Sequence, residues 1–178
     1  MSPANLWHDL EPGTAESLNV IVEIPKGSEN KYEVSRETGQ IALDRVLDPG
    51  QSFPFDYGFV PRTLWDDGDP LDVVLLAEGP LSPGTLVRAR PVAFIDMSDS
   101  GDGDAKIVAV PEGDSRWGNA RDKADVSPEI FQEIDHFFTT YKQLQHGEVI
   151  VRGIGGAAEA HAAFGRAVRL YREKFGKS

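Results

Sequence analysis

Short runs of apolar residues, each bounded by Gly, Pro or Asp, recur along this chain and predict strands. They cover residues 19–24, 72–77, 85–95, 105–110 and 149–151. Two further runs, 31–34 and 41–46, predict a hairpin that turns around Gly39. Between the hairpin and the next strand, residues 48–70 are dense in Pro and Gly and are predicted to form an ordered loop.

Two helices are predicted late in the chain from apolar residues at helical spacing. Ser127 and Pro128 suit an N-cap and a first helical position, and the first helix is predicted over residues 127–145. Its apolar stripe consists of Ile130, Ile134, Phe137, Phe138, Tyr141 and Leu144. A final helix follows the Gly-rich segment 153–156, and its stripe consists of Phe164, Val168, Tyr171 and Phe175.

These elements place the chain in the α+β class, as six or seven short strands followed by two helices. A small curled antiparallel sheet or a closed barrel, with the helices on one side, is the expected architecture. Because the chain has 178 residues, a single domain over residues 1–178 is expected, with an irregular lead-in at 1–17.

Composition excludes several classes of protein. The chain carries 18 basic and 29 acidic residues, a net charge of −11, so nucleic acid is not an expected partner. There is no cysteine, which rules out disulfides and thiolate zinc sites. No apolar run approaches ~18 residues, and the first residues lack the pattern of a signal peptide. We therefore expect a cytoplasmic protein without a membrane span.

The most informative polar pattern is a concentration of carboxylates. Asp66, Asp67, Asp69 and Asp72 lie close together and are followed at once by an apolar run. A second acidic run, at 96–104, also leads into a predicted strand. Crowded negative charges are costly unless cations lie among them, and hard divalent cations prefer carboxylate oxygens. A pair of solvated acidic turns is the alternative.

Basic residues accompany the acidic runs. Lys31 and Glu33 share one face of a predicted strand, and so do Asp104 and Lys106. Taken singly, such a pair is usually a surface ion pair of little value, and Arg45 in an apolar strand often only snorkels. Taken together, cations beside many carboxylates suit an anionic substrate that is held through metals.

Two tyrosines and one loop pattern are weaker signals when taken alone. Tyr57 and Tyr141 lie in aromatic segments and suit core packing, but a phenol also donates to a phosphate oxygen. A calcium loop of the EF-hand type is not expected, because its fifth and sixth positions would fall on Leu71 and Asp72.

In combination, these residues resemble the family I soluble inorganic pyrophosphatases in their bacterial form. The matching segments follow the family's order and are Val22–Pro25, Asn30–Glu33, Leu43–Arg45, Asp56–Phe59, Asp67–Asp72, Arg90–Val92, Asp104–Lys106, His136–Phe138 and Tyr141–Lys142. The resemblance implies a five-stranded closed β-barrel of OB-like form, with extra strands and two main helices packed outside. It also implies magnesium-dependent hydrolysis of pyrophosphate to two phosphates, by a homohexamer in the cytoplasm.

The resemblance further assigns roles to single positions. Six carboxylates would hold several magnesium ions per site: Asp67, Asp72, Asp99, Asp104, Glu23 and Glu33. Asp67, Asp72 and Asp104 would bind the tightest ion, and Asp99 would share with Asp104 an ion brought with substrate. Asp69 would be the general base that takes a proton from a metal-activated water. The phosphate-binding set would be Lys31, Arg45, Tyr57, Lys106, Tyr141 and Lys142.

Some positions depart from the family pattern. Phe53 stands where many members have Tyr, and Glu148 and Val149 stand where Lys and an aromatic residue are frequent. Asp66 matches no functional position and is expected to be a solvated turn residue. Two rival functions stay open: a metal-dependent phosphohydrolase acting on nucleotides or polyphosphate, and a barrel-shaped binding module.

Overall fold

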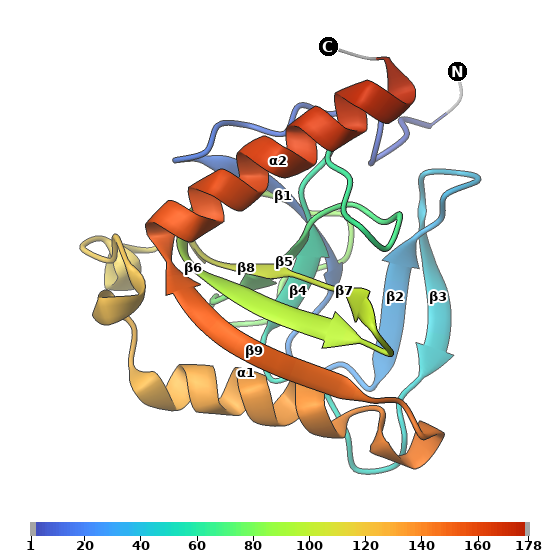
Figure 1. Cartoon of the computed structure of the whole chain (residues 1–178), viewed down its shortest axis with the longest axis vertical. Helices are drawn as coiled ribbons and strands as arrows, with labels where there is room; N and C mark the ends of the chain where they lie inside the picture. Colours follow the sequence, from blue (N-terminus) through green and yellow to red (C-terminus); the bar gives the residue numbers. More distant parts are fainter. Residues whose placement is uncertain (1–2, 177–178) are drawn as a thin grey trace.

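The computed structural model describes residues 3–176, and most of it is a strand-rich body with two long helices (Figure 1). The strands are β1 (Leu18–Ile24), β2 (Asn30–Val34), β3 (Ile41–Val46), β4 (Asp56–Phe59), β5 (Asp72–Leu75), β6 (Leu86–Asp99), β7 (Asp102–Gly103), β8 (Lys106–Pro111) and β9 (Val149–Gly156). The helices are α1 (Pro128–Thr140) and α2 (Ala157–Phe175), with 3₁₀ turns η1 (Ser115–Trp117), η2 (Lys123–Asp125) and η3 (Gln143–Gln145). Residues 3–17 form no helix or strand, as expected for the lead-in.

Five strands form a ring in a mixed sheet. The order is β1, β4, β5, β8 and β6, and β1 closes the ring by pairing with β6. β7 and β9 extend the sheet from β6, while β2 and β3 form a separate hairpin beside the ring (Figure 1). The α+β class and the strand-rich architecture are therefore confirmed.

One pair in the ring is parallel, so the expectation of an antiparallel sheet was wrong. β5 and β8 run in the same direction, with Asp72 opposite Lys106. Two parallel strands can be joined only by a long connection, and here β6 and the turn after it connect β5 to β8. The starts of β5 and β8 consequently lie side by side, and the two acidic runs that precede these strands meet at one end of the ring.

The two helices belong to apolar clusters on opposite faces of β5 and β8, so the expectation of helices on one side was also wrong. Successive residues of a strand point to opposite faces. Val74 and Val108 belong to the cluster that contains the buried residues of α1, whereas Val73 and Ile107 belong to the cluster of α2. Because both faces of these strands are apolar, each face must be shielded from water by other apolar residues. In Figure 1 the helices accordingly lie on different sides of the sheet.

Several predicted boundaries differ from the structure. β4 lies inside the predicted loop 48–70, because pairing with β1 and β5 overrides the local Pro and Gly signals. Gly58 is required there, since a Cβ would lie 2.0 Å from the carbonyl oxygen of Ile21. α1 ends at Thr140 rather than at 145; a turn and η3 follow, and η3 is capped by His146, whose φ is 57°. β9 also continues five residues beyond the predicted end at 151.

No helix within residues 3–176 is long and apolar enough to cross a membrane.

Candidate active site

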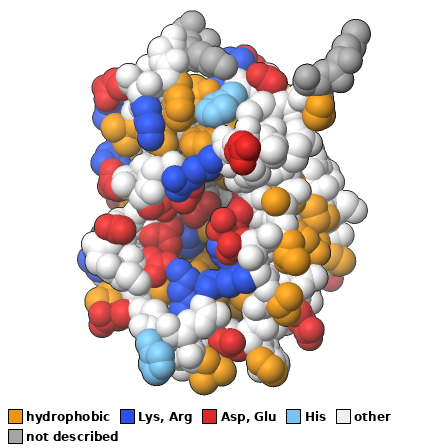
Figure 2. Space-filling model, turned by 90° about the vertical axis from the view of Figure 1, so that its right-hand side faces the viewer, with side chains coloured by type: hydrophobic (Ala, Val, Ile, Leu, Met, Phe, Trp, Pro, Cys, Tyr) orange, Lys and Arg blue, Asp and Glu red, His pale blue; other side chains and the backbone are white. Residues whose placement is uncertain are grey.

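A cavity of about 350 Å³ opens where the starts of β5 and β8 meet. Its lining contains every site residue that the sequence predicted except Arg45. The lining also contains residues that were not predicted, namely Tyr32, Val34, Pro70, Ser100 and Asp102. Figure 2 shows acidic side chains gathered around a hollow on this face, with basic side chains at its edge. The structure thus brings residues from seven strands and the segment after α1 to one place.

Lys106 is the buried cation of the cavity. Its side chain is 3% exposed, and Nζ donates to Tyr57 Oη at 2.7 Å, to Asp104 Oδ1 at 2.7 Å and to Asp72 Oδ2 at 3.0 Å. Burial opposes its charge, but Asp104 and Asp72 raise the pKa of Lys106 above its usual value. Lys106 therefore stays charged and compensates part of the negative charge around it.

Lys106 neutralises only part of the negative charge of the carboxylates around it. Burial, reinforced by the charge of Asp104, raises the pKa of Asp72 to about 7, although Lys106 acts in the opposite direction. Burial and the charge of Asp72 likewise raise the pKa of Glu23, whose Oε1 accepts a bond from the Val34 N–H at 2.7 Å. Burial also raises the pKa of Asp67. A site with these shifts favours the arrival of further positive charge.

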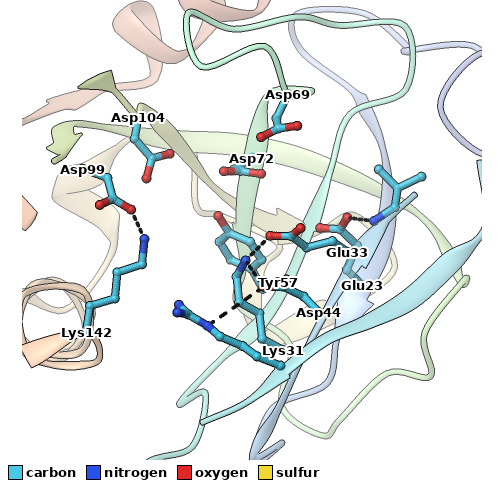
Figure 3. A network of polar contacts seen from close by, with 12 residues as sticks. Glu23, Lys31, Glu33, Asp44, Tyr57, Asp69, Asp72, Asp99, Asp104 and Lys142 are labelled. Atoms are coloured by element: carbon cyan, nitrogen blue, oxygen red, sulfur yellow. Dashed lines mark hydrogen bonds and ion pairs between the residues drawn. The ribbon is translucent and has the colours of Figure 1, made fainter. Parts of the chain in front are cut away.

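Asp69 lies at the mouth of the cavity and is held by a residue that the sequence analysis missed. Arg36, from the turn between β2 and β3, donates from Nε to Asp69 Oδ1 at 2.8 Å, and its Nη2 lies 2.5 Å from the same oxygen. The Asp69 backbone N–H donates to Asp67 Oδ1 at 3.0 Å, which shapes the turn. Asp69 and Asp72 therefore point into the same space, as Figure 3 shows.

On the opposite wall, Lys142 pairs with Asp99 (Figure 3). Burial opposes the ionised form of Asp99, but the hydrogen bond from Lys142 outweighs it and lowers the pKa of that carboxyl. Ser100 Oγ donates to the same carboxylate at 3.1 Å. This pair brings the end of β6 next to the segment that follows α1.

The hairpin of β2 and β3 supplies two more cations. Lys31 and Arg45 are register partners, and Lys31 pairs with Glu33 and with Asp44, at 3.1 Å from the latter. Burial opposes the charge of Lys31, yet Glu33 and Asp44 raise its pKa. Arg45 binds Gln145 and lies over the ring of Tyr141. Its Nε is buried without a hydrogen-bond partner among the described residues.

The aromatic residues serve both the cavity and the core. Tyr57 and Tyr141 line the cavity, and both also belong to the cluster that holds Phe137 and Phe138. Burial raises the pKa of Tyr57, so its phenol stays protonated. Phe53, which departs from the family pattern, is 2% exposed and packs against Tyr57 and Phe137. Phe53 therefore has a core role.

Asp66 is an exposed turn residue, as expected, but it also has an ion-pair partner. Its carboxylate lies 2.6 Å from Arg166 Nη2, which belongs to α2. Nothing in local sequence pairs these two residues, because they are 100 positions apart.

The cavity has the chemistry of a hard-cation site. Its lining contains eight carboxylates but only three lysines. Among residues 3–176, no three His, Cys, Asp or Glu side chains converge closely enough to hold a metal ion by themselves. Lys106 lies between Asp72 and Asp104. Because Mg²⁺ binds through a few carboxylates and completes its shell with water and phosphate, these residues fit it.

Comparisons with known proteins agree with one another. The sequence profile described as inorganic pyrophosphatase matches residues 20–172. The chain is 52% identical over 145 residues to the inorganic pyrophosphatase of Leifsonia xyli, covering 81% of this chain and 89% of that protein. It is 42% identical over 174 residues to the inorganic pyrophosphatase of Haloferax volcanii, covering 96% and 98%.

Solved structures give the same result. The crystal structure of inorganic pyrophosphatase from Thermus thermophilus matches with a TM-score of 0.90 and 41% identity, covering 95% of this chain and 99% of that one. The structure of the inorganic pyrophosphatase from Helicobacter pylori matches with a TM-score of 0.87 and 38% identity, covering 92% and 98%.

Proposed function

We propose a magnesium-dependent mechanism for this chain, which belongs to the inorganic pyrophosphatase family and is an enzyme that hydrolyses pyrophosphate. The binding-module alternative is therefore excluded. The observation that carries the mechanism is the meeting of both acidic runs with three lysines in one cavity.

Cations on two walls of the cavity would bind the substrate. Lys31 and Lys142 face the space from β2 and from the segment after α1 (Figure 3). The buried Nε of Arg45 makes no hydrogen bond within residues 3–176, its ion-pair partner Asp44 Oδ2 being 3.9 Å away, and Arg45 stands next to Lys31 in the hairpin register. A pyrophosphate oxygen would satisfy this donor, since charge-assisted bonds to phosphate are strong. Tyr57, Tyr141 and Lys106 would complete the phosphate-binding set.

Six carboxylates would hold the metal: Asp67, Asp72, Asp99, Asp104, Glu23 and Glu33. When bound, Mg²⁺ would supply the positive charge that lowers the pKa of a water and neutralises phosphate oxygens. The raised pKa values of Asp72, Glu23 and Asp67 support this assignment, because a divalent cation would relieve the repulsion that raises them.

Asp69 would be the general base. Its carboxylate would accept a proton from the attacking water, whose oxygen would then attack one phosphorus in line. The bond from that phosphorus to the bridging oxygen would break, and the second phosphate would leave with the negative charge. Lys31 and Lys142 would stabilise this charge, and positioning and electrostatics of this kind dominate phosphoryl transfer.

Some finer features of the family are also part of the proposal. We infer that the ring of five strands is a closed OB-like barrel, that residues 1–178 form one domain, and that the enzyme is a cytoplasmic homohexamer. The continuous pairing around the ring supports the first inference. Static light scattering on the purified protein measures the number of subunits.

Substrate choice is tested by phosphate release from pyrophosphate, ATP and tripolyphosphate in the presence of Mg²⁺. A cavity of about 350 Å³ is at the small end for ligand sites, so pyrophosphate is expected to react far faster than the two larger substrates. Faster release from ATP or tripolyphosphate would contradict this proposal and favour the other phosphohydrolase class.

Arg45→Gln is expected to raise KM for pyrophosphate about tenfold with a smaller change in kcat, because it removes a charge-assisted donor to the substrate. Steady-state kinetics measure both constants. Arg88→Gln, an exposed arginine on β6, is the control and should leave both unchanged. An unchanged KM in Arg45→Gln would remove Arg45 from the binding set.

A further inference from the structure

Arg166 of α2 binds the base of the loop that carries Asp67 and Asp69. Its guanidinium lies over the ring of Trp65, 4.4 Å from the ring centroid, and its Nη2 lies 2.6 Å from Asp66 Oδ1. One side chain therefore holds two consecutive residues that immediately precede Asp67. In Figure 1 the segment between β4 and β5 accordingly lies beside α2.

Trp65 closes the turn in which Asp67 and Asp69 are placed. Its backbone N–H donates to the Asp69 carbonyl at 2.8 Å, and its carbonyl accepts from the Gly68 N–H at 3.1 Å. A second bond joins this segment to α2, because the Leu64 N–H donates to the Ala167 carbonyl at 3.0 Å. The orientation of the turn is thus set by its attachment to the helix.

Asp66 also contacts the second acidic run. A Cβ added to Gly103 would lie 3.3 Å from Asp66 Oδ2, so this carboxylate lies close to the residue before Asp104 and leaves little room for a side chain there. Arg166, Asp66 and Gly103 therefore form a continuous contact from α2 to both acidic runs. No part of the catalytic mechanism requires these three residues.

We propose that Arg166 is a positioning residue, which fixes the turn of Asp67 relative to Asp104 through Trp65 and Asp66 and so prepares the Mg²⁺ site. This proposal rests on the proposed function only in assigning Mg²⁺ to these carboxylates. Neither Arg166 nor Asp66 lines the cavity. Outer residues that orient metal ligands commonly change metal affinity by tenfold or more, and an exposed pair is expected at the low end of that effect.

Two variants separate positioning from simple electrostatics. Arg166→Gln removes a positive charge, so electrostatics alone would strengthen Mg²⁺ binding. Asp66→Asn removes a negative charge, so electrostatics alone would weaken it. Positioning predicts that both variants weaken binding, because each breaks the same contact. It also predicts that the double variant loses no more than the more affected single variant, since the two changes act on one interaction.

Calorimetric titration of the full chain with Mg²⁺ provides the readout, and circular dichroism verifies that each variant is folded. We expect Arg166→Gln and Asp66→Asn each to weaken Mg²⁺ affinity about three- to tenfold. Arg166→Lys should recover part of the loss, because it keeps the charge that pairs with Asp66. Arg169→Gln makes the same chemical change on an exposed position of α2 and should bind as the wild-type protein does.

Unchanged or tighter Mg²⁺ binding by Arg166→Gln would overturn the proposal, as would additive losses in the double variant. Phosphate release from pyrophosphate by the wild-type protein, with and without Mg²⁺, is measured in parallel. A wild-type protein that binds no Mg²⁺ would overturn this proposal and the proposed function together. Normal wild-type binding with unaffected variants would overturn only the role of Arg166.

Discussion

Asp69→Asn is expected to lower kcat for pyrophosphate by about a hundredfold or more, with Mg²⁺ affinity changed by less than about threefold. An amide has nearly the same shape as a carboxylate and still accepts a bond from Arg36, but it does not take a proton at neutral pH. The loss should therefore fall on the chemical step. Steady-state kinetics at saturating Mg²⁺, combined with calorimetry, measure the two quantities separately.

Asp135→Asn is the matched control for this variant, because it makes the same change on the exposed surface of α1, away from the cavity. It should retain full activity. If Asp69→Asn keeps its kcat, another group takes the proton. If it loses Mg²⁺ binding as severely as activity, Asp69 acts as a metal ligand instead.

Asp72→Asn is expected to stabilise the metal-free protein at pH 8 while it abolishes most activity. The pKa of Asp72 is about 7 in the folded protein, whereas an unfolded Asp has an ordinary value near 4. The folded state thus binds a proton on Asp72 more tightly than the unfolded state does. The stability that it contributes is fully present below about pH 4 and is lost as the pH rises through about 7.

Asn removes that loss, so the unfolding free energy should exceed the wild-type value by roughly 4 kcal/mol at pH 8, and Tm by about 10 °C. The difference should shrink towards pH 5. Because Asp72 is assigned to the metal, the gain in Tm on adding Mg²⁺ should be smaller in the variant. Thermal unfolding at both pH values, with and without Mg²⁺, tests this. A variant less stable than the wild type at pH 8 would contradict the assigned cause.

The acidic runs could be identified from the sequence because the signal lies in residues that are neighbours along the chain. Carboxylates crowded before a buried strand predict a cation site in any fold. The assembly of the cavity depended instead on the direction of β5 and β8. The antiparallel sheet, one of the two architectures expected from the sequence, would not have placed Asp72 beside Lys106. Periodicity reports which residues are buried, but it does not report which strands pair.

Two arginines show why the outer contacts of the site were not predicted. Arg36 and Arg166 belong to a hairpin turn and to the polar face of a helix, where an exposed cation is ordinary. Only the folded chain brings them to Asp69 and Asp66. Their partners lie 33 and 100 positions away, a separation that no local pattern spans.

The central claim is that the carboxylates of both acidic runs act through Mg²⁺ to hydrolyse pyrophosphate. Phosphate release by protein treated with a chelator, before and after Mg²⁺ is restored, tests it most directly. We predict almost no release without Mg²⁺ and full recovery, with two phosphates formed per pyrophosphate, once Mg²⁺ is added. Undiminished release from the metal-free protein would contradict the account.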